Sequence, residues 1–102
     1  SGASARIFRH LSNPARLPNP LPRYYAISRG EVNGEMAAIS APVFGARNEL
    51  VGALQISSPI ARFTDDHVEM LKSVDTEASV RLSISLGLDP RQFSSDLEAL
   101  HD

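Results

Sequence analysis

Two short apolar runs separated by a polar turn most strongly constrain what this chain can fold into. The first run is residues 37–44 (AAISAPVF), the second is residues 50–57 (LVGALQIS), and residues 45–49 (GARNE) lie between them. Both runs are rich in small and β-branched residues, and the segment between them has turn composition, which predicts a β-hairpin. Asn48 is expected to adopt the left-handed backbone in this turn, because asparagine tolerates positive φ.

Alternation of side chains along the two strands divides the predicted hairpin into two faces. One face is apolar and needs a core to cover it; it carries Ile39, Ala41, Val43, Leu54 and Ile56. The other face is small and polar, and it carries Ala38, Ser40, Gln55 and Ser57. The second face is therefore suited to lining a cavity.

A long helix is predicted over 64–86, directly after the hairpin. Thr64 is the expected N-cap, because two acidic residues follow it in the first turn and complement the helix dipole. Gly87 is the expected stop. Apolar residues recur at spacings of three and four, which predicts that one stripe packs on the apolar side of the sheet: Val68, Leu71, Val74, Ala78, Leu82 and Leu86. A second, weaker stripe requires another helix or a partner chain: Met70, Val80 and Ile84.

The flanking segments give weaker signals. Residues 3–11 favour a short helix with Ser1 or Ser4 as N-cap, and Ile7, Phe8 and Leu11 form its apolar stripe. Residues 17–22 contain three prolines, which predicts a loop.

A strand over 24–28 and a polar connection over 29–34 are expected to lead into the hairpin. In the tail, residues 93–100 are expected to form one or two extra helical turns capped by Ser94 or Ser95.

Length, charge and composition exclude several classes of protein. The 102 residues have room for one domain, and the net charge of −2 predicts no affinity for nucleic acid or acidic membranes by itself. The chain has no cysteine, and its longest apolar runs are too short to span a membrane, so a cytoplasmic location is expected. Five arginines precede the first acidic residue, and they form either an anion-attracting patch or a solvated face: Arg6, Arg9, Arg16, Arg23 and Arg29.

Groups that could carry catalysis are sparse. His10, His67 and His101 are far apart and lack metal-ligand spacing, and no serine lies in a nucleophile context. We therefore expect no enzyme activity and no cofactor. What remains is the polar hairpin face and the helix start at Gly2 and Ala3, whose free backbone N–H groups favour an anion.

Four segments in order resemble the C-terminal effector-binding domain of the IclR family of bacterial transcriptional regulators. They are residues 25–31 (YAISRGE), 38–44 (AISAPVF), 51–59 (VGALQISSP) and 62–66 (RFTDD). The family has a strand close to I-A-A-P-V-F, a turn, a strand close to V-x-A-L-S-I-S-G-P and a helix opening with R-x-T. The resemblance covers most of residues 25–87, and the order and spacing of the four segments make it specific.

The start of the chain is similar to the same family. Residues 1–8 (SGASARIF) resemble its S-G-x-G-K-A-L-L helix start, and residues 21–24 (LPRY) resemble the stretch after that helix. In the family a further segment separates this stretch from the next strand, whereas here Tyr24 directly precedes Tyr25, either by deletion or by omission of a segment. The chain is thus expected to be a partial effector-binding domain over 1–102, without the winged helix-turn-helix domain and the leading strands.

The resemblance implies an α+β, GAF-like fold: an antiparallel sheet with helices packed on one face and an effector pocket on the other. Family effectors are mostly small organic or aromatic acids. The residues matching the effector site here are Gly2, Ala3, Ser28, Ala38, Ser40, Gln55 and Ser57. Gln55 stands where the family commonly has serine, which predicts a smaller or differently oriented ligand.

The resemblance therefore implies a sensor domain that binds a small organic acid and modulates DNA binding by the full-length regulator. Contact with DNA would be made only through the winged-helix domain, and a homodimer or dimer of dimers is expected. The alternative is a GAF-like dimerisation scaffold with no small-molecule ligand.

Overall fold

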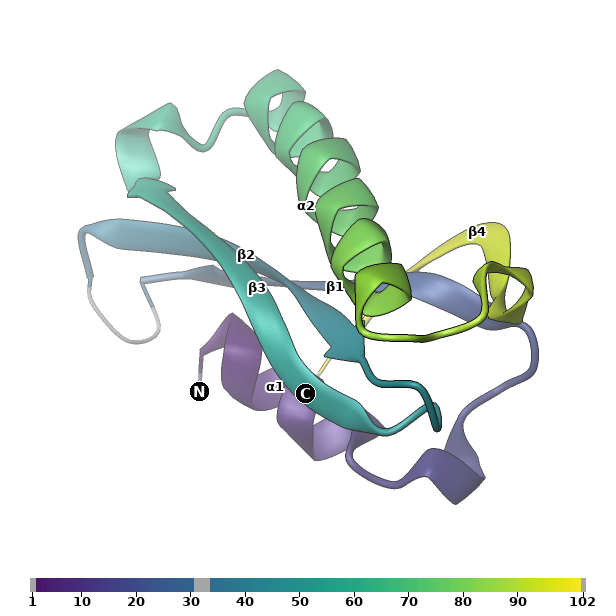
Figure 1. Ribbon diagram of the computed structural model, residues 1–102. Helices are drawn as coiled ribbons and strands as arrows, with labels where there is room; N and C mark the ends of the chain where they lie inside the picture. The colour runs from purple at the N-terminus through teal and green to yellow at the C-terminus, as the bar shows by residue number, and fades with distance from the viewer. Residues whose placement is uncertain (1, 31–33, 102) are drawn as a thin grey trace.

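The fold is a four-stranded sheet with one helix on each face (Figure 1). The computed structural model describes residues 2–30 and 34–101. Its sheet has the strand order β3-β2-β1-β4. The main elements are α1 (Ala3–Leu11), β1 (Leu21–Arg29), β2 (Met36–Phe44), β3 (Leu50–Pro59), α2 (Asp65–Ser85) and β4 (Phe93–Ala99). The expected connection at 29–34 lies partly outside the described residues.

The predicted hairpin is confirmed and forms β2 and β3. Ile39 pairs with Ile56, and Ser40 pairs with Gln55, so the apolar and polar faces are those that the alternation predicts. Asn48 has a φ of 63° in the turn, as expected. The ladder shifts register between Val43 and Phe44.

The central strand β1 begins earlier than the sequence predicts. Leu21 and Pro22 belong to this strand, so the loop expected over 17–22 is wrong at its end. Pro22 is tolerated because it lies at the register shift between Leu21 and Arg23, where β1 has β4 on one side and no described pairing with β2. β1 thus pairs with β4 over its first half and with β2 over its second half.

The tail is a strand, and the expected helical turns are wrong. β4 runs parallel to β1, with Leu21 opposite Phe93 and Tyr25 opposite Ala99. Through these pairings the backbone of β4 bonds to a strand that lies 72 to 74 residues earlier in the chain. Serine capping signals are local, so they could not predict such a distant contact.

The expected α+β fold is confirmed, with two differences in detail. The sheet is mixed, because β4 is parallel to β1. The helices lie on opposite faces, since α1 packs through Ile7 against Tyr24 and Ala26, whereas α2 packs through Leu71 against Ile39 (Figure 1).

Helix α2 begins and ends at the predicted residues. Thr64 is the N-cap, and its hydroxyl accepts a hydrogen bond from the His67 N–H at 3.4 Å. Gly87 has a φ of +108°, and the Leu88 N–H bonds to the Ser83 carbonyl across it, which closes the helix in the geometry that glycine favours. At α1 the N-cap is Gly2, which makes no side-chain cap. The expectation of Ser4 in this role is wrong, since Ser4 lies within the helix, and Ser1 lies outside the described residues.

The predicted buried stripe of α2 is correct only in its first turns. Val68 and Leu71 are buried, but Val74, Leu82 and Leu86 are exposed and Ala78 is half-buried. The buried face continues through four polar side chains instead: Asp75, Thr76, Ser79 and Ser83. The second stripe is also outward, with Met70 and Ile84 exposed.

Hydrogen bonding explains why α2 turns these polar residues, and not the predicted apolar stripe, toward the sheet. The register shift in the hairpin occurs at Phe44, and the buried Phe44 N–H donates to the Ser83 hydroxyl at 2.9 Å. Ser83 donates in turn to the Ser79 carbonyl, and Ser79 donates to the Thr76 carbonyl. Because these hydroxyls satisfy themselves on the backbone of their own helix, they can be buried without the penalty of an unpaired polar group.

Asp75 is the exception on this face. Its side chain is fully buried, and neither carboxylate oxygen has a hydrogen-bond partner among the described residues. Burial raises the pKa of Asp75 from 3.8 to about 7, because an apolar environment disfavours the charged form.

Candidate functional site

A cavity of about 220 Å³ lies between the start of α1 and the polar face of the hairpin. We refer to it as the α1 cavity. It is lined by Gly2, Ala3, Ser28, Met36, Ala37, Ala38, Gln55 and Ser57. Six of the seven residues predicted from the sequence therefore meet around one space. The seventh, Ser40, does not line the cavity; it is fully buried behind it.

A chain of hydrogen-bonded polar side chains ends at two lining residues of the α1 cavity, Gln55 and Ser57. The Ser4 hydroxyl lies 3.0 Å from the Ser40 hydroxyl and donates to Gln55 Oε1 at 2.8 Å. Because a serine has one hydroxyl proton, Ser40 is then the donor to Ser4. Gln55 Nε2 donates to the Ser57 hydroxyl at 3.2 Å. Ser57 is thus left with its own proton to donate to a ligand.

The start of α1 supplies the second polar feature of the cavity. Gly2, the N-cap, makes no side-chain hydrogen bond to the first turn, and that turn contains no acidic residue. Backbone N–H groups at such a helix start are orphan donors with positive potential. The eight lining residues include no charged side chain. The α1 cavity is therefore suited to an anionic group held by neutral donors.

Three contributors were missed by the sequence analysis. Met36 lies two residues before Ala38, so extending the alternation by one step would have placed it on the cavity face. Ala37 faces the opposite core by alternation, and no sequence pattern marks it as a lining residue. Ser4 lies inside the helix and matters through its bond to Gln55, a contact across 51 residues.

Comparison with protein families shows which family the chain belongs to. The model of the bacterial transcriptional regulator IclR C-terminal family matches residues 17–85. The chain belongs to this family. The strands that line most of the α1 cavity and the whole of α2 fall within the matched segment, whereas α1 precedes it.

Solved structures of IclR-family regulators are similar to this domain. A protein of Silicibacter sp. described as an IclR transcriptional regulator is 26% identical with a TM-score of 0.62, covering 70% of this chain and 28% of that one. A targeted domain of another IclR-family protein is 25% identical with a TM-score of 0.58, covering 63% of this chain and 37% of that one. The repressor BlcR of Agobacterium tumefaciens, 22% identical with a TM-score of 0.60, covers 62% and 26% and shows the same fold.

The chain thus spans between about a quarter and just over a third of these three solved chains, one of which is itself a targeted domain. No curated protein matches the chain. Among residues 2–30 and 34–101, no group of three or more histidine, aspartate or glutamate side chains is placed to hold a metal ion. None of the helices in this part of the chain is long and apolar enough to cross a membrane.

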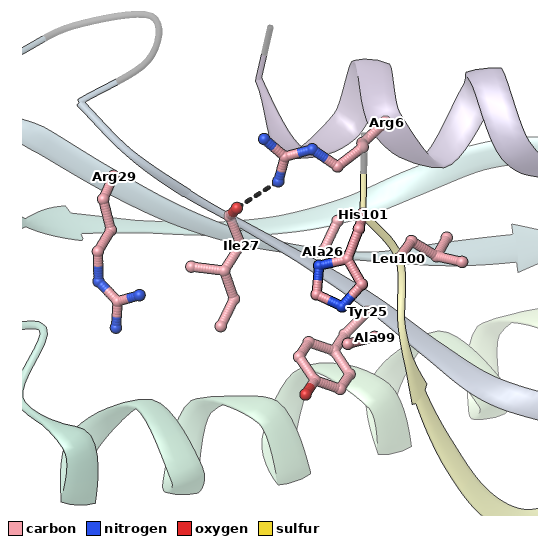
Figure 2. A pocket seen from close by; sticks show the side chains of 8 residues that line it. All are labelled: Arg6, Tyr25, Ala26, Ile27, Arg29, Ala99, Leu100 and His101. Carbon is pink, nitrogen blue, oxygen red and sulfur yellow. Dashed lines mark hydrogen bonds between the residues drawn. The ribbon is translucent and has the colours of Figure 1, made fainter.

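A second cavity lies at the edge of the sheet, where β4 ends (Figure 2). We refer to it as the edge notch, and its volume is about 340 Å³. It is lined by Arg6, Tyr25, Ala26, Ile27, Arg29, Ala99, Leu100 and His101. Two of the five arginines that precede the first acidic residue therefore line this cavity, although the sequence left open whether these arginines form a patch.

Proposed function

We propose that this IclR C-terminal domain senses a small organic or aromatic acid in the α1 cavity and thereby modulates DNA binding by a longer regulator. Operator binding is assigned in this proposal to other parts of that regulator. A ligand that prefers one arrangement of the protein shifts its population toward that arrangement.

One observation carries the proposal: the free proton of Ser57 and the uncapped start of α1 face the same small cavity. Both are donors, and a carboxylate offers two oxygens that accept. The remaining lining residues are small and largely apolar, and they would surround the organic part of the acid. The volume of about 220 Å³ favours a compact acid.

Titration of a serine variant tests this proposal. A panel of small carboxylic acids is first screened by thermal shift, because a ligand that binds the native state raises its apparent stability. Ser57→Ala should then weaken binding of the best acid by about 1.5–3 kcal/mol in calorimetry, the usual size of a hydrogen bond to a charged group. Gln55→Ser should enlarge the cavity and admit bulkier acids.

The matched control is Ser58→Ala. Ser58 follows Ser57 in β3, and alternation places its side chain on the opposite face of the sheet. This variant should bind the acid as the wild type does. Equal affinity in the wild type, Ser57→Ala and Gln55→Ser would show that the acid lies elsewhere, and the proposal would be withdrawn.

A second candidate function, a dimerisation scaffold without a ligand, is favoured by the outward face of α2. Met70 and Val74 are each 51% exposed, and Leu82 is 41% exposed on the same helix. Exposed apolar surface of this kind is frequent where chains associate. A panel in which no acid raises the thermal midpoint, together with a concentration-dependent dimer in sedimentation, would favour the scaffold over the sensor.

A further inference from the structure

The edge of β1 is open beyond the end of β4. The last bond recorded between these strands, within the described residues, joins the Leu100 N–H to the Tyr25 carbonyl at 2.8 Å. On the other side of β1, the Gly30 N–H bonds to the Met36 carbonyl of β2. Main-chain groups alternate in direction along a strand, so those of Ile27 and Arg29 face the open edge.

Two arginines reach this edge from opposite sides of the sheet (Figure 2). Arg6 extends from α1, is only 7% exposed, and donates from Nη1 to the Ile27 carbonyl. Arg29 lies at the end of β1, and its guanidinium is 5.6 Å from the centre of the Phe63 ring on the α2 side. Arg29 forms no ion pair with any residue of the described ranges.

The bond from Arg6 also decides what kind of ligand the edge can accept. An added strand needs acceptors as well as donors, and the Ile27 carbonyl is already occupied by Arg6. The Ile27 and Arg29 N–H groups and the Arg29 guanidinium remain as donors, whereas the Arg29 carbonyl is the one backbone acceptor of these two residues still facing the edge. A surplus of donors that includes a guanidinium suits an anion better than a peptide backbone.

We propose that the edge notch is a second ligand site, one that binds the carboxylate of a small amphipathic acid through Arg29 and the exposed N–H groups of β1. The apolar part of the acid would lie against Leu100, Ile27 and the Tyr25 ring, which line the same cavity. The site is separate from the α1 cavity, because none of its lining residues is shared with that cavity.

Amide titration with benzoate tests this proposal on the 102-residue chain. Benzoate should shift the backbone N–H signals of Ile27 and Arg29, together with the Arg29 side-chain Nε–H, in a saturable manner. Arg29→Gln should weaken this binding at least tenfold, since it removes a charge-assisted contact. Arg29 is exposed, so the substitution should leave the fold intact. Arg47→Gln removes the same charge from the exposed hairpin turn and should change nothing.

Three results would overturn the proposal. The Ile27 and Arg29 signals would stay in place as benzoate is added, or Arg29→Gln would bind as tightly as Arg47→Gln. Alternatively, inorganic phosphate would shift the same signals with the same affinity as benzoate, showing that the notch responds to charge alone. Ser57→Ala distinguishes the two sites, because it should weaken binding only in the α1 cavity. It should leave the Ile27 and Arg29 shifts unchanged.

Discussion

Helices α1 and α2 pack on opposite faces of one sheet and bury different chemistry. α1 buries Ala3, Ile7 and Leu11, at the spacing of an amphipathic helix, and one charged residue, Arg6. Phe8, the third member of its predicted apolar stripe, is exposed. α2 buries Val68 and Leu71 and then continues with hydroxyl groups and a carboxyl group, while its apolar residues face outward. The comparison teaches that apolar periodicity predicts a buried face only in part, because each helix also buries a polar side chain that bonds to a backbone group of the sheet: Arg6 in α1 and Ser83 in α2.

The largest expected difference between the two helices is in how much stability is lost when an apolar side chain is truncated to alanine. Ile7→Ala should destabilise the domain by about 2–5 kcal/mol, because Ile7 is fully buried and its removal leaves a cavity. Val74→Ala on α2 should change stability by less than about 0.5 kcal/mol, as for most surface positions. Urea unfolding of both variants measures this directly. Similar losses for the two would mean that the outward face of α2 is covered in solution.

The buried carboxyl of α2 should make stability depend on pH in a way that α1 does not. The pKa of Asp75 is about 7 in the fold, against an ordinary value of 3.8. The folded state therefore holds a proton that the unfolded state releases, and the associated stability is present below about pH 4 and lost as the pH rises through 7. At about 1.4 kcal/mol per pKa unit, the loss is roughly 4 kcal/mol.

Asp75→Asn should abolish most of this slope when urea unfolding is repeated between pH 4 and pH 8. Asp75→Asn should also be the more stable protein at pH 8. Glu77→Gln, which removes an exposed carboxyl from the same helix, serves as the control and should keep the wild-type slope. An unchanged slope in Asp75→Asn would show that the carboxyl gains a partner or reaches water.

A smaller effect on stability is expected at the hydrogen bond from the Phe44 N–H to Ser83, which holds the polar face of α2 against the sheet. Ser83→Ala removes the acceptor for the buried Phe44 N–H and should cost about 1–3 kcal/mol. Ser85→Ala removes only a hydroxyl that donates to the Leu82 carbonyl at an exposed position, so its effect should stay within about 0.5 kcal/mol. If Ser83→Ala lowered the stability in thermal unfolding no more than Ser85→Ala, the burial of the polar face of α2 would need another explanation.

Local signals predicted the hairpin, its two faces and the ends of α2 because each depends on neighbouring residues. Thr64 caps its own helix, and Asn48 adopts its own turn conformation. What could not be predicted depends on distant contacts: β4 pairs with β1, and the buried Ser83 accepts a hydrogen bond from Phe44 at the register shift of the hairpin.

The same division holds for the candidate site. The alternation of β2 and β3 placed Ala38, Gln55 and Ser57 on one face from the residues alone, and the helix start at Gly2 and Ala3 was marked as favouring an anion. The family resemblance joined these two features into one site and added Ser28. The edge notch escaped prediction because it depends on where β4 stops pairing with β1. A run of arginines gives no information about which of them meet in the fold.

The α1 cavity as an acid site is the central claim, and amide titration with the acid that gives the largest thermal shift tests it most directly. The proposal predicts saturable shifts of the Ala3 and Ser4 N–H signals at the start of α1 and of Ser57 in β3, with one common affinity. These shifts should be lost in parallel in Ser57→Ala, while Ser58→Ala retains them. Ala3, Ser4 and Ser57 signals that stay in place for every acid in the panel would contradict the claim.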